Sequence, residues 1–135
     1  KIDVVYGARS KGDFVDYGEL TTVWPESAGM NVYLTIDRPE EDWSGNVGFV
    51  PQYLKDLSFS TDKTVLVCGP PIMIKLTLAA LEEMGFSKEQ VYTTMEMKMK
   101  CGIGKCGRCN IGSKYVCKDG PVFRCDELDE LPDEY

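Results

Sequence analysis

The residues best suited to chemistry are four cysteines in a glycine-rich stretch of the chain. They follow the spacing C-x4-C-x2-C-x7-C and are Cys101, Cys106, Cys109 and Cys117. The first three match the plant-type spacing of [2Fe–2S] proteins, in which a fourth, more distant cysteine completes the ligand set. Thiolates suit iron–sulfur clusters, and intervening glycines let a tight loop curl inward. The spacing therefore predicts a [2Fe–2S] cluster on these four cysteines.

The charge pattern agrees with a cluster in this stretch. The chain carries a net charge of −7, yet residues 98–118 include six basic residues and no acidic one. A cluster on four thiolates is negatively charged, and nearby cations offset that charge; they include Lys100, Lys105, Arg108 and Lys118. The acidic balance of the whole chain argues against sequence-independent binding of nucleic acid. The acidic run at 126–135 is interpreted as a solvated tail.

Two other uses of the cysteines stay open. A zinc ribbon on Cys106, Cys109, Cys117 and Cys125 has the spacing C-x2-C-x7-C-x7-C, but it leaves Cys101 unused. Disulfides are disfavoured because Cys106 and Cys109 are too close to pair in a compact loop. The chain has no histidine, which excludes His-based metal sites and Ser-His-Asp or Cys-His catalysis.

Alternating strands and helices precede the cysteines. Apolar runs at 2–6, 31–36, 64–68 and 91–95 predict strands, and segments 13–24, 49–57 and 72–84 predict helices, the first N-capped by Asp13 and the last ended by Gly85. This order is typical of an α/β fold with a doubly wound parallel sheet. The pattern stops near Glu96, so we expect an α/β domain over 1–96 and a cysteine-rich module with an acidic tail over 97–135. No apolar stretch reaches the ~18 residues that span a bilayer.

Two strand ends carry residues suited to binding a nucleotide. Gly7 and Arg9 follow the first strand, and Gly69 and Pro70 follow the third. Open parallel sheets bind ligands at the carboxyl ends of their strands. A glycine there lets the backbone approach a ligand, and an arginine holds phosphate through paired hydrogen bonds. Residues 102–107 also fit G-x-G-x-x-G, but they do not lie between a strand and a helix, so they are not interpreted as a dinucleotide fingerprint.

Several segments together resemble one family. They are Cys-Gly-Pro-Pro-Ile-Met at 68–73, Thr-Met-Glu at 94–96, Met-Lys-Cys-Gly-Ile-Gly-Lys-Cys-Gly-Arg-Cys at 99–109 and Val-Cys-Lys-Asp-Gly-Pro-Val-Phe at 116–123, with Tyr-Gly-Ala-Arg at 6–9. They are similar to the C-terminal half of the diaphorase-type electron-transfer subunits of the ferredoxin-NADP reductase superfamily. Members include the gamma subunit of NAD(P)-linked nickel–iron hydrogenases (sulfhydrogenases), the electron-transfer subunit of dihydroorotate dehydrogenase B and the corresponding subunit of anaerobic sulfite reductase.

The resemblance implies a role for each candidate site residue. Gly7, Arg9, Gly69 and Pro70 would line the NAD(P) site, Glu96 would approach the flavin ring, and the four cysteines would bind the cluster. The family order places a β-barrel FAD domain before the nucleotide domain. We therefore expect this chain to be a truncated C-terminal part, without the FAD domain and without the first strand and glycine-rich turn of the nucleotide domain. Its NAD(P) site would then be incomplete, and the chain alone would be inactive.

The implied function is electron relay within a multi-subunit oxidoreductase. Electrons would pass between NAD(P)H and FAD on one side and a catalytic partner subunit on the other, through the [2Fe–2S] cluster. The short loop between Cys109 and Cys117 favours the hydrogenase and sulfite reductase members, with the dihydroorotate dehydrogenase electron-transfer subunit as an alternative. A zinc-stabilised binding module without a redox role is the other alternative. Reduced thiols indicate the cytoplasm, and an unprotected sheet edge predicts self-association.

Overall fold

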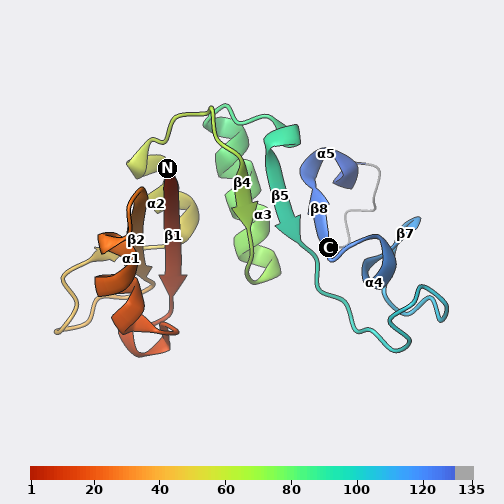
Figure 1. Ribbon diagram of the computed structural model, residues 1–135, viewed down its shortest axis with the longest axis horizontal. Helices are drawn as coiled ribbons and strands as arrows, with labels where there is room; N and C mark the ends of the chain where they lie inside the picture. Colours follow the sequence, from red (N-terminus) through yellow and green to blue (C-terminus); the bar gives the residue numbers. More distant parts are fainter. Residues whose placement is uncertain (130–135) are drawn as a thin grey trace. The chain divides into compact units, whose positions relative to one another are not determined.

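The computed structural model describes residues 1–129, so the last six residues of the predicted acidic tail lie outside the described part. The chain divides into two compact units, one over Lys1–Phe59 and one that begins at Ser60. The division falls inside the stretch predicted as a single α/β domain. In Figure 1 the first unit runs from red to yellow and the second from yellow-green to blue. Each unit is described by itself.

The first unit is built on parallel strands. β1 (Ile2–Ala8) pairs in parallel with β2 (Met30–Ile36) along its whole length, from Ile2↔Met30 to Ala8↔Ile36. A short third strand, β3 (Asn46–Val47), joins the other side of β2. The helix α2 (Val50–Leu57) follows, where the sequence predicts a helix, and has Pro51 in its first turn. The two longer strands confirm the sequence prediction, whereas β3 lies in a stretch for which we predicted neither strand nor helix.

The predicted helix at 13–24 begins later than expected. Residues Lys11–Asp13 form a short 3-10 turn (η1), and the helical segment consists of the π-helical η2 (Glu19–Val23) followed by α1 (Trp24–Glu26). Asp13 is not an N-cap, because its carboxylate accepts a hydrogen bond from the Ser10 hydroxyl at 2.8 Å and so belongs to the preceding turn. Phe14 and Leu20 of this stretch are buried.

The core of the first unit is aromatic. Phe14, Leu20 and Ile36 are its buried centre. The Phe14 ring meets Tyr6 edge-on at 5.2 Å between centroids and stacks on Trp43 at 5.6 Å. Edge-to-face and offset stacks are the favoured aromatic geometries. They attach the segment before η2 to the β1–β2 pair.

The second unit begins with a β-α-β arrangement. β4 (Val65–Val67) and β5 (Val91–Thr94) pair in parallel, and α3 (Pro71–Glu83) and the 3-10 turn η3 (Lys88–Gln90) connect them. Pro71 opens α3, where its missing N–H costs nothing, and Gly85 follows its end. These elements confirm the strands and the helix that the sequence predicts here.

The cysteine-rich module adds its own strand to this sheet. After the hairpin of β6 (Asn110–Ile111) and β7 (Lys114–Tyr115) come α4 (Val116–Asp119), β8 (Val122–Arg124) and α5 (Cys125–Leu128). β8 pairs antiparallel with β5, with Thr94 opposite Val122, and Figure 1 shows the two strands side by side. An antiparallel edge strand on an otherwise parallel sheet is common. The sequence analysis placed no strand in this module.

Membrane insertion finds no support in the described helices. Within residues 1–129, none is both long enough and apolar enough to cross a bilayer.

The β5–β8 pairing makes a prediction about stability. Phe123 is 3% exposed and faces the sheet interior, whereas its neighbour Val122 on the same strand is 52% exposed. We expect Phe123→Ala to lower the free energy of unfolding by about 3–5 kcal/mol, because it opens a cavity in the core. The matched change Val122→Ala should cost no more than about 0.5 kcal/mol. Urea unfolding followed by circular dichroism measures both, and equal losses would contradict the described burial.

Candidate functional site

The cysteine loop leaves β5 and follows no regular secondary structure. From Met95 to Cys109 the chain has neither helix nor strand, as the thin trace after β5 in Figure 1 shows. Gly102, Gly104 and Gly107 share a φ of +71°. Side chains disfavour this left-handed conformation, whereas glycine adopts it without strain. The three glycines therefore set the turns of the loop.

These turns aim backbone N–H groups at two of the predicted ligands. The N–H groups of Lys105 and Cys106 donate to Cys101 Sγ, with N···S distances of 3.3 and 3.4 Å. The N–H of Gly104 donates to Cys117 Sγ at 3.2 Å. The consecutive N–H groups at 104–106 thus donate both to Cys101, at the start of the loop, and to Cys117, which follows the β6–β7 hairpin. Hydrogen bonds to the sulfurs are a recognised determinant of cluster potential.

The hydrogen bonds change the acidity of the thiols. Backbone N–H groups of Ile103, Cys106 and Lys105 lower the pKa of Cys101 to about 6, because they stabilise its thiolate. The pKa of Cys117 is raised, first because its thiol hydrogen-bonds to Cys109 and then because of burial. The Cys101 thiol also interacts with Cys106, and the Cys117 thiol interacts with both Cys109 and Cys101.

The described side chains do not form a ready site for a single metal ion. In the described part of the chain, no group of three or more Cys, Asp or Glu side chains is placed to hold one ion. The four thiolates of a [2Fe–2S] cluster divide as two for each iron, so they need not meet at one point. Cys109 is buried, Cys106 is exposed, and Cys101 and Cys117 are half-buried.

Cys125, which the zinc alternative requires, has another environment. It lies in α5, is 7% exposed, and burial raises the pKa of its thiol to about 11. The charges nearest to it are those of Asp126, Lys88 and Asp129. A thiol with such a pKa is protonated at neutral pH.

The cations predicted to offset the cluster charge lie on the surface of the loop. Lys100, Lys105, Arg108 and Lys118 are all exposed. The aliphatic stem of Lys118 lies across Gly104, where an added methyl group would be 2.9 Å from Lys118 Cδ. Glycine at position 104 thus allows a positive residue to lie over the turn that hydrogen-bonds Cys117.

The predicted nucleotide residues of the second unit line one cavity. It has a volume of about 940 Å³ and lies at the carboxyl ends of β4 and β5, where Gly69, Pro70 and Glu96 form part of its wall. Sequence analysis missed the rest of the lining, which comes from α3, from β5 and from the cysteine module; it includes Ile74, Lys75, Leu78, Thr94, Ile111 and Leu128. The cavity therefore has walls from both predicted domains. Thr94 carried a signal, since it belongs to the Thr-Met-Glu segment of the family resemblance.

The two candidate glycines at strand ends are tightly packed. A methyl group on Gly7 would lie 2.5 Å from Val50 Cγ2, so this glycine brings β1 close to α2. At Gly69 the space of a side chain is taken by the methyl group of Met73, whose sulfur accepts a hydrogen bond from the Thr77 hydroxyl at 3.3 Å. Both glycines therefore have a packing role, whatever ligand they contact. Arg9 is exposed at the end of β1.

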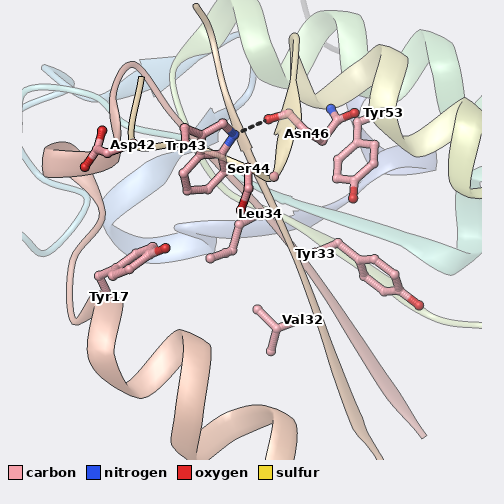
Figure 2. Close-up of a pocket in the computed structure, with 10 residues that line it drawn as sticks. Tyr17, Val32, Tyr33, Leu34, Asp42, Trp43, Ser44, Asn46 and Tyr53 are labelled. Atoms are coloured by element: carbon pink, nitrogen blue, oxygen red, sulfur yellow. Dashed lines mark hydrogen bonds between the residues drawn. The ribbon is translucent and has the colours of Figure 1, made fainter. Parts of the chain in front are cut away.

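A smaller cavity lies in the first unit. Figure 2 shows its lining, with Tyr17 and Trp43 on one side of β2 and Tyr33 and Tyr53 on the other. Its volume is about 280 Å³. The indole N–H of Trp43 donates to the carbonyl of Asn46 at 2.8 Å, which fixes the loop before β3. None of the residues predicted as ligands lines it.

Parallel strands that end at a large cavity, followed by a four-cysteine loop in the same unit, define an oxidoreductase module with a nucleotide side and an iron–sulfur side. Comparison with known families agrees. Residues 1–78 match the oxidoreductase NAD-binding domain, and residues 96–129 match the iron–sulfur cluster binding domain of dihydroorotate dehydrogenase B. The chain belongs to the oxidoreductase NAD-binding domain family and carries this iron–sulfur domain behind it.

Two relatives and one solved structure illustrate what this chain is similar to. The chain is 36% identical to sulfhydrogenase 1 subunit gamma of Pyrococcus furiosus, over 97% of this chain and 47% of that protein. It is 36% identical to a probable dihydroorotate dehydrogenase B (NAD(+)) electron transfer subunit of Thermococcus kodakarensis, over 95% and 48%. A solved NADH-dependent reduced ferredoxin-NADP oxidoreductase is similar over 96% of this chain and 44% of that one, with a TM-score of 0.66 and 27% identity. The chain spans about half the length of these proteins.

The glycine turns make a prediction about the cluster site. Gly102 and Gly104 have the same φ of +71°, but only Gly104 has a neighbour within 4 Å, the Lys118 side chain. We expect both Gly→Ala changes to strain the backbone by about 1–2 kcal/mol. Gly104→Ala should shorten the lifetime of the visible iron–sulfur absorption in air more than Gly102→Ala, because it also displaces the N–H that bonds Cys117. Equal lifetimes would contradict this role of Gly104.

Proposed function

We propose that this chain is the nucleotide-and-cluster part of a diaphorase-type electron-transfer subunit. It relays electrons between NAD(P)H, acting with FAD, and a catalytic partner subunit. The observation that carries the proposal is the cysteine loop, in which the N–H groups of Gly104, Lys105 and Cys106 donate to the sulfurs of Cys117 and Cys101, in the unit whose strand ends form the large cavity. We propose residues 1–96 as the nucleotide side and residues 97–135 as the cluster side.

The proposed role of this chain's residues is to hold the cluster and adjust its potential, not to react themselves. A bound [2Fe–2S] cluster supplies one-electron transfer. Cys101, Cys106, Cys109 and Cys117 hold it, and the N–H groups of Gly104, Lys105 and Cys106 stabilise negative charge on the sulfurs. The exposed Cys106 edge of the loop faces solvent, where a partner subunit has access.

Nucleotide-binding residues are proposed at strand ends, with each unit taken by itself. Gly69, Pro70 and Glu96 line the cavity of the second unit, and Gly7 and Arg9 lie at the end of β1 in the first. The exposed guanidinium of Arg9 is suited to a phosphate. The flavin ring is proposed to approach from the side of Glu96. The FAD site is proposed to lie in a separate domain, so we propose that these 135 residues alone have no turnover.

The partner is proposed from the relatives. The gamma subunit of sulfhydrogenase 1 supports a hydrogenase-type catalytic partner, as does the short loop between Cys109 and Cys117. The iron–sulfur domain match and the electron transfer subunit of Thermococcus kodakarensis support dihydroorotate dehydrogenase as the second candidate. Both would work in the cytoplasm, where thiols stay reduced.

Metal analysis of the anaerobically purified chain tests the proposal. We expect about two irons and two acid-labile sulfides per chain and a red-brown visible spectrum that dithionite bleaches. A colourless protein with one zinc per chain would replace the redox function by a structural metal module.

Two cysteine variants sharpen this test. Cys101→Ser should abolish the visible absorption, because it removes the thiolate that accepts backbone hydrogen bonds. Cys125→Ser is the matched control and should keep the iron content, since that thiol is buried in α5 and stays protonated. The zinc alternative requires the reverse pattern.

Self-association is proposed from the open side of β4. In the described part of the chain β4 has a hydrogen-bonded strand on one side only, and Leu66 at its centre is 78% exposed. Open edges and exposed apolar side chains favour pairing with another copy. We expect light scattering to show a concentration-dependent rise in mass, and Leu66→Lys to reduce it. A monomer at every concentration would refute this.

A further inference from the structure

The large cavity of the second unit has mainly apolar walls with few polar groups. Ile74 and Leu78 of α3, Ile111 of β6 and Leu128 of α5 give it hydrocarbon surface. Its side-chain polar groups include the hydroxyl groups of Thr93 and Thr94, the Glu96 carboxylate and the Lys75 ammonium. Cavities of this kind suit a flat ring that has a few hydrogen-bonding atoms at its edge.

Thr94 differs from the other threonines of the interior. Within residues 1–129, its hydroxyl oxygen is the only buried side-chain N or O atom without a hydrogen-bond partner. The buried hydroxyls of Thr35, Thr77 and Thr93 donate to Gly48 O at 2.6 Å, Met73 Sδ at 3.3 Å and Thr94 O at 3.5 Å. A buried hydroxyl without a partner destabilises the fold, because it gives up water and gains nothing in exchange. Thr94 lines the cavity, whereas its hydroxyl oxygen is closed off from solvent, and such an unpaired group calls for an explanation.

The position of Thr94 offers that explanation. It is the last residue of β5, two residues before Glu96, and it lines the same cavity as Gly69 and Pro70. Rotation about its Cα–Cβ bond between staggered positions exchanges the hydroxyl and the methyl group without moving the backbone. A ligand in the cavity can therefore take up the hydroxyl as a hydrogen-bond donor or acceptor.

We propose that Thr94 is a positioning residue that hydrogen-bonds the amide edge of a flat redox ring bound in this cavity. The inference rests on the proposed function, which brings two such rings to this place, the nicotinamide and the flavin isoalloxazine. Both present amide atoms at the edge of a planar ring, so both fit the hydroxyl and the apolar walls. Turning the hydroxyl toward the ring would give it the hydrogen-bond partner that it lacks in the described structure.

Two substitutions separate this role from a structural one. Thr94→Val keeps the shape and removes the hydroxyl, and Thr94→Ser keeps the hydroxyl. Isothermal titration calorimetry with NAD+ and with FMN, on the anaerobic chain of full length, gives the affinities. AMP serves as a control because it has no amide-bearing redox ring. Thermal unfolding of the same preparations gives the stability.

We expect at least one of NAD+ and FMN to bind, and Thr94→Val to weaken that binding about fivefold, as the loss of one hydrogen bond implies. Thr94→Ser should stay within about twofold of the unchanged protein, and the affinity for AMP should not change. The Tm of Thr94→Val should be equal or higher, because the variant no longer buries an unpaired hydroxyl. Which probe responds identifies the ring.

Other outcomes overturn the proposal. If Thr94→Val binds both probes as the unchanged protein does, the hydroxyl does not position the ring. If its Tm falls while affinity stays the same, the hydroxyl has a structural partner. If neither probe binds the unchanged protein, the cavity does not take such a ring. Iron and sulfide content of the same samples reports on the proposed function separately, since Thr94→Val changes none of the four cysteines and keeps the backbone groups that pair with β8.

Discussion

The cysteine loop depends on one strand pairing, that of β5 with β8. The chain leaves the sheet at Thr94 and returns at Val122, directly opposite in the ladder. The Met95 N–H extends the contact by donating to Pro121 O at 2.9 Å. Residues 95–121 thus form a long loop, and the β5–β8 pairing holds its two ends together. Closing such a loop has an entropic cost, and the ladder and the buried Phe123 offset it, so that the four cysteines are held in one place.

The hydrogen bonds inside this loop explain why it is rich in glycine. Backbone N–H groups face Cys101 and Cys117, and only left-handed glycine turns bring them there. The same hydrogen bonds lower the pKa of Cys101, so a thiolate is available near neutral pH. As a consequence, the loop has few buried side chains of its own. The basic surface of the loop, in a chain of net charge −7, suits the negatively charged cluster that we propose for it.

The large cavity connects the two halves of the proposed function. Its walls come from the ends of β4 and β5, from α3 and from the cysteine module, with Ile111 only two residues after Cys109. A ring bound there would lie beside the chain segment that holds a cluster ligand. This proximity suits electron transfer, in which the protein sets distance and potential and the cofactors carry the chemistry. Thr94, whose hydroxyl has no partner in the described structure, lines the same cavity.

Local pattern alone was enough to predict the cysteine loop, the α/β order and the strand ends at Gly7 and Gly69, because these depend on spacing, on periodicity and on glycine. The prediction was wrong about Asp13, whose side chain closes a turn with Ser10 instead of capping a helix. No strand was predicted at 122–124, since a three-residue strand has no periodicity to detect and forms only because β5 offers a free edge. The cavity lining at Thr94, Ile111 and Leu128 likewise depends on long-range packing. These residues are far apart in sequence, and only the antiparallel return of the chain to β5 brings them together.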